Sequence, residues 1–228
     1  MNLRPCFALA AVLVSALTAG LSPTTAHAGS GDGFTETFAA APAAPWKWIR
    51  ENKAAWRTGP QGLEVRIEPG NMWGPANDAK NILVRPAPAA PASGSLEVTA
   101  TVHNQPTGQY EQTDLVWYFD DSHMVKIGQE MVDGKLSIVM GREEKDTTKT
   151  MGIYPLKTSK VKLRLNVQGD NITGEYQPDG EGPWLKAGTC TAPRPAGGRE
   201  QIALMFYQGT VEAPHWSRVS ELKLVARP

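Results

Sequence analysis

The sequence has little cysteine, with Cys6 and Cys190 as its two cysteines. Cys6 falls in the N-terminal targeting segment described below, which leaves Cys190 alone and excludes an internal disulfide. In an oxidising compartment, a lone cysteine is either buried or an unpaired thiol. Nothing in the sequence around Cys190 resembles the setting of a nucleophile, so we expect it to be buried.

Charge of one sign is not in excess, since 23 Lys and Arg residues balance 23 Asp and Glu residues. The first 28 residues contain one base and no acid, so the remainder has a net charge of −1. The sequence therefore has no basic excess that would bind nucleic acid and no polybasic run that would bind a membrane surface. We expect neither as a partner.

One apolar run stands out, at the N-terminus. Arg4 precedes it, Phe7–Leu17 forms it, and Ala26-His27-Ala28 follows as a small-x-small cleavage signal. The run is shorter than the about 20 residues that a membrane span requires, although an uncleaved anchor is the alternative. We expect residues 1–28 to be a signal peptide. The mature chain, residues 29–228, is expected to be periplasmic or secreted, with no membrane span.

A sustained helical period is also missing, and a short helical turn within residues 45–56 is the most that the pattern allows. Strand-like runs recur instead about every 8–12 residues, with turn signals such as Asp133-Gly134 between them, which is typical of a sandwich or barrel. The sequence predicts a single all-β domain over residues 29–228, with strands at Gly62–Ile67, Asn81–Val84, Leu96–His103, Gln112–Phe119, Met124–Glu130, Leu136–Met140, Val161–Val167, Ile172–Tyr176, Gln201–Tyr207 and Arg218–Val225.

Several segments follow one another in an order and spacing found in one group of proteins. They are Trp46-Lys47-Trp48-Ile49-Arg50-Glu51-Asn52, Trp56, Gly62-Leu63, Pro69-Gly70-Asn71-Met72-Trp73-Gly74, Asn81-Ile82-Leu83-Val84-Arg85, Gln112 to Ile127, and Trp184 after the Asp179-Gly180 turn. Together they resemble the concanavalin A-like (laminin G-like) C-terminal domain of bacterial β-xylosidases. They resemble equally a related family of uncharacterised secreted bacterial proteins with the same fold.

The resemblance implies a jelly-roll sandwich of two antiparallel sheets, one of them concave. Members of this superfamily bind saccharides or cap the active site of a neighbouring glycosidase domain, and no catalytic domain accompanies the module in this sequence. The chain departs from the pattern at Thr113 and Asp114, where the family has Ala and Gly. A carboxylate in place of glycine indicates a ligand unlike the usual one.

A row of polar residues runs along the two strands within 112–130. Alternation in a strand places its members on one face, where amides, carboxylates and a phenol can bind sugar hydroxyls. The alternative is a solvated ladder of ion pairs, which would contribute little to stability. Asp120 and Asp121 are expected to be solvated turn residues instead. The predicted ligand-binding row is Gln112, Asp114, Tyr118, Lys126 and Glu130.

A second candidate group surrounds Trp73, in a loop that also contains Asn71 and Asn77, with Asn81 after it. An indole in such a loop can stack on a sugar ring; the alternative is a plug over the edge of the core. Of the other tryptophans, Trp117 alternates to the face opposite Asp114 and is expected in the core. Trp46, Trp48 and Trp56 are also expected to be structural.

Catalytic and metal chemistry have weaker support. Asp114 and Glu130 are the candidate acid pair of a glycoside hydrolase, and Lys126 with Tyr118 is the candidate pair of a polysaccharide lyase. The histidines are scattered, without the spacing of a zinc site. No cofactor is expected apart from a calcium ion, for which the candidates are Asp32, Glu36 and Glu221.

The function expected from these residues is recognition of a carbohydrate on the concave sheet, without catalysis. Two alternatives remain open. One is a glycoside hydrolase or polysaccharide lyase that acts on an extracellular polysaccharide, and the other is a protein-interaction module of the cell envelope.

Overall fold

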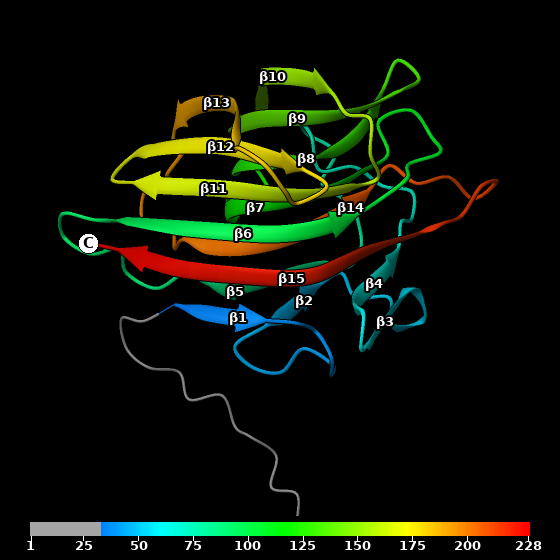
Figure 1. Ribbon diagram of the computed structural model, residues 1–228, viewed down its shortest axis with the longest axis horizontal. Coiled ribbons are helices and arrows are strands. Elements are labelled where there is room, and N and C mark those ends of the chain that lie inside the picture. The colour runs from blue at the N-terminus through cyan, green and yellow to red at the C-terminus, as the bar shows by residue number, and fades with distance from the viewer. Residues whose placement is uncertain (1–32) are drawn as a thin grey trace, which may run out of the picture.

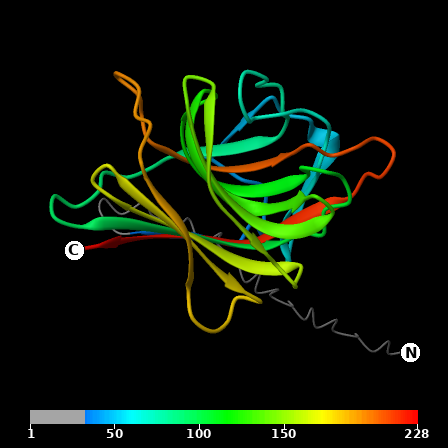
Figure 2. The ribbon, with the colours of Figure 1, turned by 90° about the horizontal axis from the view of Figure 1, so that it is seen from above.

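The computed structural model describes residues 33–228, which form two antiparallel sheets packed face to face (Figures 1 and 2). The strands of sheet A lie in front in Figure 1 and those of sheet B behind them. The fold is all-β, as the strand pattern predicts, and it is a concanavalin A-like jelly-roll sandwich, as the family resemblance implies. The expected signal peptide and Asp32 lie outside the described residues.

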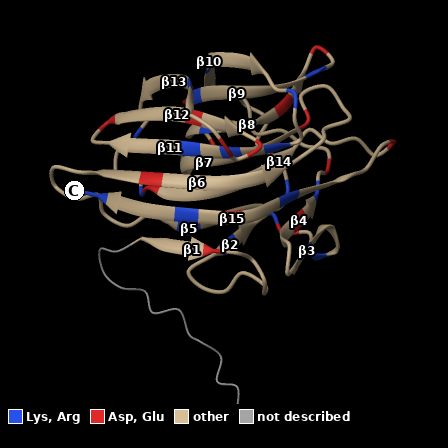
Figure 3. Ribbon diagram, in the orientation of Figure 1, with Lys and Arg blue, Asp and Glu red and all other residues tan. Residues whose placement is uncertain are grey.

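Sheet A has eight strands, of which β1 pairs with β15 beside the main path. Its charges of both signs are interspersed, as Figure 3 shows. In spatial order its strands are β13 (Leu185–Thr191), β12 (Asn171–Pro178), β11 (Lys160–Gln168), β6 (Ser95–His103), β15 (Trp216–Arg227), β4 (Gly62–Arg66) and β3 (Trp56–Gly59), with β1 at Phe34–Glu36.

Sheet B has seven strands and carries the site described below. Sequential strands β7, β8, β9 and β10 form a meander, while β14 returns from near the C-terminus to pair with β7. In spatial order the strands are β10 (Thr147–Pro155), β9 (Lys135–Glu144), β8 (His123–Val132), β7 (Gln112–Asp120), β14 (Gln201–Tyr207), β5 (Ile82–Pro86) and β2 (Lys47–Ile49).

The main core lies between the two sheets. On β11 every second residue is buried, from Val161 to Val167, because one face packs on sheet B and the other meets water. On β7 all residues except Asp120 are buried. Trp117 packs in the main core, as predicted. Burial on both faces of β7 means that something also covers the outer face of sheet B.

A second apolar cluster provides that cover. The segment between β4 and β5 packs Met72 and Ala79 against Val116, Tyr118 and other buried residues on the outer face of sheet B. Burial of this apolar area stabilises the loop by about 25 cal/mol per Å². The loop therefore has a fixed position, which matters because it also carries Trp73.

The ten predicted strands are all present, within a few residues of their expected ends. The helical turn expected within residues 45–56 is limited to one 3₁₀ turn, Lys53–Ala55, and the flanking residues form β2 and β3. Trp48 and Trp56 stack at 5.0 Å between ring centroids. Trp46, which is buried, packs on Phe34 at 6.2 Å. These three tryptophans are structural, as expected.

Candidate functional site

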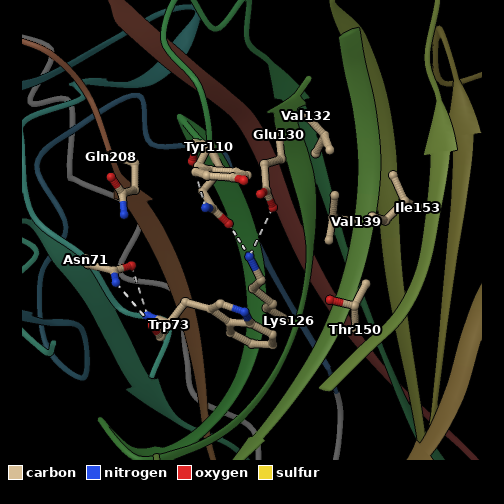
Figure 4. Close-up of a pocket in the computed structure, with 11 residues that line it drawn as sticks. Asn71, Trp73, Tyr110, Lys126, Glu130, Val132, Val139, Thr150, Ile153 and Gln208 are labelled. Carbon is tan, nitrogen blue, oxygen red and sulfur yellow. Dashed lines mark hydrogen bonds and ion pairs between the residues drawn. The ribbon is translucent and has the colours of Figure 1, made fainter. Parts of the chain in front are cut away.

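A cavity of about 430 Å³ opens on the face of sheet B that points away from sheet A. Figure 4 shows its polar floor on β7 and β8, the Trp73 loop on one side and an apolar wall on β9 and β10 opposite. The lining residues are Asn71, Trp73, Tyr110, Gln112, Lys126, Glu130, Val132, Val139, Thr150, Ile153 and Gln208.

The register between β7 and β8 brings the polar side chains of the cavity floor together. Gln112 pairs with Glu130, and Val116 pairs with Lys126. Residues separated by two along a strand share a face, so Gln112, Lys126 and Glu130 all project to the outer side. The hairpin thus brings together side chains that are up to 18 residues apart in sequence.

The ammonium group of Lys126 is the centre of the floor. It donates hydrogen bonds to Gln112 Oε1, to Glu130 Oε2 at 3.2 Å and to the Tyr207 hydroxyl at 3.2 Å. Asp114 Oδ2 lies 3.9 Å from the same nitrogen. The three N–H donors therefore have three partners, and the carboxylate of Glu130 balances the charge of the ammonium group.

Asp114 lies beneath this network and is fully buried. The hydroxyl of the buried Tyr207 lies beside the Asp114 carboxylate. Burial raises the pKa of Asp114 to about 7, with nearby Lys126 lowering it, Glu130 raising it and the Tyr207 hydroxyl lowering it. The carboxyl group is therefore partly protonated near neutral pH, since burial disfavours its charged form.

Glu143 of β9 is a further buried carboxylate at the edge of this network. Its Oε2 accepts a hydrogen bond from the backbone N–H of Gly74 at 3.2 Å. Burial raises the pKa of Glu143 to about 7, against the effect of that hydrogen bond and of Lys126. The contact also ties β9 to the Trp73 loop.

Asn71 fixes the conformation of the Trp73 loop. Its Oδ1 accepts hydrogen bonds from the backbone N–H groups of Met72 and Trp73, at 2.9 and 3.1 Å, and its Nδ2 donates to the Trp73 carbonyl. The indole lies against the backbone of Gly141, where a Cβ would come within 2.3 Å of it. Lys126 Nζ is 4.8 Å from the ring centroid, within cation–π range.

Tyr110 stands at the rim and is half-exposed. Its φ is 64°, and hydrogen bonds to the side chain of the next residue, Glu111, stabilise this strained turn. The buried Glu111 accepts the backbone N–H groups of Thr107 and Gly108 at 2.7 and 2.8 Å, and lies 2.6 Å from His215 Nδ1. Burial alone would raise the pKa of Glu111, but these hydrogen bonds hold it below its usual range.

Comparison with known protein families shows to which family the chain belongs. The family described as "Protein of unknown function (DUF1349)" matches residues 48–197. The chain belongs to this family. The match spans β2 to the segment after β13 and so includes every cavity-lining residue except Gln208. No match was found among the curated proteins.

Several solved structures share the fold of this family member. The GH43 BlXynB protein from Bacillus licheniformis has a TM-score of 0.72 at 17% identity, over 84% of this chain and 39% of that one. The xylan β-1,4-xylosidase from Bacillus halodurans C-125 has 0.70 at 16%, over 91% and 41%. A functionally unknown protein from Saccharomyces cerevisiae has 0.59 at 14%, over 80% and 96%. Identities this low show a common fold, and the chain spans about two fifths of the two Bacillus proteins.

The structure brings most of the predicted ligand-binding residues together. Gln112, Lys126, Glu130 and Trp73 line the cavity. The alternative of a solvated ladder is not found, because the ion pairs of Lys126 are buried: its side chain is 3% exposed. Three members of the row and the Trp73 loop, predicted as two separate groups, line one cavity.

Three predicted residues lie elsewhere. Asp114 is buried below the floor. Tyr118 is 4% exposed in the apolar cluster under the loop, and its hydroxyl donates to Asp121 at 2.7 Å. Asn77 Nδ2 donates to Asp146 at 3.4 Å, away from the lining residues. Side-chain alternation predicts the face of a residue but not the depth at which it lies.

Asp121 differs from its expected role as a solvated turn residue. It forms an ion pair with Arg50 at 2.7 Å, and Arg50 also donates to the carbonyl of Ala79. Asp120, whose side chain is half-exposed, contacts His123 Nδ1 at 2.7 Å. Asp121 therefore helps to hold the segment that carries Trp73, from the far end of the hairpin.

The calcium candidates are not gathered into a site by the described residues. Glu36 accepts the backbone N–H of Phe38 at 3.0 Å, and Glu221 lies 3.8 Å from Lys162. Over residues 33–228, no group of three His, Cys, Asp or Glu side chains is placed to hold a metal ion. In the same range, no helix has the length and apolarity that crossing a bilayer requires.

Cys190 is a free thiol and is partly buried, at the end of β13. Burial raises its pKa to about 11, so at neutral pH it is a thiol and not a reactive thiolate. This agrees with the expectation that it is no nucleophile, while its burial is less complete than expected.

Several site residues are not predicted by the sequence pattern. Tyr207 is the last residue of β14, Gln208 follows it, Glu143 lies on β9, and Tyr110 lies in the turn before β7. The apolar wall of Val139 and Ile153, and Val132 at the end of β8, have the pattern of ordinary strand sequence. Tyr207 could have been placed on a face of its sheet, because it ends a predicted strand whose successive side chains point to opposite faces.

Proposed function

We propose that this protein binds a saccharide in the cavity of sheet B and does not convert it chemically. One observation carries the proposal. The cavity combines an indole and a phenol with an apolar wall and a hydrogen-bonding floor, in a volume of about 430 Å³. This volume suits a ligand of one to a few sugar rings, since small-molecule sites range from about 300 to 1,000 Å³.

The proposed contacts divide by chemistry. Trp73 and Tyr110 offer faces for the C–H groups of a sugar ring, while Glu130, Thr150 and Gln208 offer acceptors and donors to its hydroxyls. The floor is preorganised, because the Lys126 network fixes Gln112 and Glu130 before any ligand arrives. Preorganisation lowers the entropy that binding costs.

The geometry favours binding over hydrolysis. A glycosidase pair must reach both sides of a glycosidic bond, whereas Asp114 has no exposed surface and lies below Lys126. The lyase pair of Lys126 and Tyr118 is divided in a similar way, since the Tyr118 hydroxyl is bound to Asp121. Incubation with xylans, arabinans and uronate polymers should therefore release no reducing ends and no unsaturated products.

Export is the second part of the proposal. The support is the sequence of residues 1–28, with its base, apolar run and small-x-small site. An exported saccharide-binding protein would meet polysaccharides outside the cytoplasm. N-terminal sequencing of the protein recovered from periplasm and medium tests this point. A mature start at Gly29 is expected, whereas an intact Met1 in the cytoplasmic fraction would contradict it.

The binding test uses purified residues 29–228 in titration calorimetry. Xylo-oligosaccharides are the first probes, because one protein that shares this fold is named as a xylan β-1,4-xylosidase. A glycan array extends the search to other sugars. Saturable binding that Trp73→Ala weakens is expected. No binding to any saccharide, or binding that Trp73→Ala leaves unchanged, would contradict the proposal.

A further inference from the structure

The charge balance of the floor bears on which saccharides fit. Of the residues that line the cavity, Lys126 and Glu130 are the charged ones. They are 3.2 Å apart and form a buried pair, with side chains 3% and 10% exposed. A ligand in the cavity therefore meets a neutral pair and not an isolated cation.

Lys126 has no donor left for a ligand. Its three N–H groups point to Gln112, Glu130 and Tyr207. A carboxylate or sulfate that approached the ammonium would have to displace one of these partners, and a displaced Glu130 would remain as a like charge beside the ligand. Leaving a buried charge unpaired is costly.

Further negative charge lies behind the pair. Asp114 Oδ2 is 3.9 Å from Lys126 Nζ, and Glu143 is buried on the neighbouring strand. Among the described residues that line the cavity, no arginine and no second lysine offset these carboxylates. Each proton that Asp114 or Glu143 loses makes the floor more negative. While Glu130 is ionised, the formal charges of Lys126, Glu130, Asp114 and Glu143 therefore sum to zero or to a negative value.

We infer that the cavity accepts uncharged saccharides and excludes saccharides that carry carboxylate or sulfate groups at the ring that it binds. The inference rests on the proposed function and narrows it. A cationic amino sugar is not favoured either, because Glu130, the accessible carboxylate, already pairs with Lys126 at 3.2 Å. A second ammonium there would face the first.

The test compares matched oligosaccharides by calorimetry with residues 29–228 at pH 7.5. Xylotetraose and arabinotetraose are the uncharged probes and tetragalacturonate the anionic one, while tetraglucosamine, measured beside the uncharged probes at pH 6.0 where its amines are protonated, is the cationic one. We expect an uncharged probe to bind at least tenfold more tightly than either charged one. Tetragalacturonate binding as tightly as the best uncharged probe, or tetraglucosamine doing so, would overturn the inference and leave saccharide binding intact. If none of the four binds and a wider glycan array is also negative, the proposed function fails.

Two further measurements separate charge from shape. Removing carboxylates with Asp114→Asn or Glu130→Gln should improve tetragalacturonate binding several-fold relative to the uncharged probe. For the wild-type protein, raising NaCl from 50 to 500 mM should narrow the difference in affinity between tetragalacturonate and the uncharged probe, because salt screens repulsion. This measurement remains informative even if a variant fails to fold. If neither the substitutions nor the salt alters the ratio of the two affinities, steric fit causes the exclusion, and the electrostatic argument is overturned.

Discussion

Asp114 and Gly128 face each other across β7 and β8, and the carboxylate occupies the space that a side chain at position 128 would fill. A Cβ on Gly128 would lie 1.7 Å from Asp114 Oδ1 and 2.5 Å from the carbonyl oxygen of Thr113. The glycine thus lets a charged side chain lie against the sheet, beneath Lys126. The departure at position 114 from the β-xylosidase-like pattern has its structural counterpart here.

Gly128→Ala should destabilise the protein by about 1–3 kcal/mol, the usual cost of overpacking. Adding Asp114→Gly should restore part of the loss, because one of the two close contacts disappears. Urea unfolding followed by tryptophan fluorescence measures both. Gly59→Ala is the matched control, since nothing lies within 4 Å of its Cβ position. Equal losses in the two glycine variants would contradict the prediction.

Lys126→Met should cost about 3–5 kcal/mol, because it leaves Glu130 and Asp114 as buried carboxylates without their cation. Combining it with Glu130→Gln and Asp114→Asn should recover most of the loss, since the uncompensated charges are then gone. Denaturant unfolding of the single and triple variants tests this. Lys223→Met, at an exposed position of β15, should change stability little. A triple variant less stable than the single one would contradict the account.

Stability should depend on pH through Asp114. Its folded pKa is about 7, against an ordinary value of 3.8, so the folded state holds the proton more tightly. Its contribution is fully present below about pH 4 and is lost as the pH rises to about 7. With about 1.4 kcal/mol per pKa unit, the loss is on the order of 4 kcal/mol.

Asp114→Asn removes this dependence. The stability of the wild-type protein relative to this variant should therefore fall between about pH 4 and pH 7 and stay level above that range. Denaturant midpoints at each pH provide the measurement, with Glu212→Gln, an exposed acid, as the control. Parallel pH profiles for wild type and Asp114→Asn would show that Asp114 ionises normally.

Trp73→Ala should weaken binding of an uncharged oligosaccharide at least tenfold, if the indole is the stacking surface. Gly141→Ala should weaken it as well without touching the ligand, because its Cβ would meet the indole at 2.3 Å and displace it. Calorimetry measures affinity, and tryptophan fluorescence reports the displaced ring. Trp184→Ala, which removes an indole stacked on Arg164 at 4.0 Å in sheet A, should leave affinity unchanged.

Strands with strong alternation could be predicted, and five others could not. β1, β2 and β3 have three or four residues each, too few for a period to emerge. β10 is mostly exposed and rich in threonine, so it lacks apolar alternation. Its extended conformation comes from pairing with β9, and that of β13 from pairing with β12. Tertiary context decides such segments.

The sequence by itself determined the class of fold and the face of sheet B on which Gln112, Lys126 and Glu130 lie, because side chains alternate along a strand and the turn at residues 121–122 sets the hairpin. Only the tertiary structure decided how deeply each of these residues is buried and which side chains it contacts. Pairing of β14 with β7 brings Tyr207 to Lys126, and the loop at Asn71 lays Trp73 on Gly141. Both contacts join segments at least 68 residues apart, which no local pattern records.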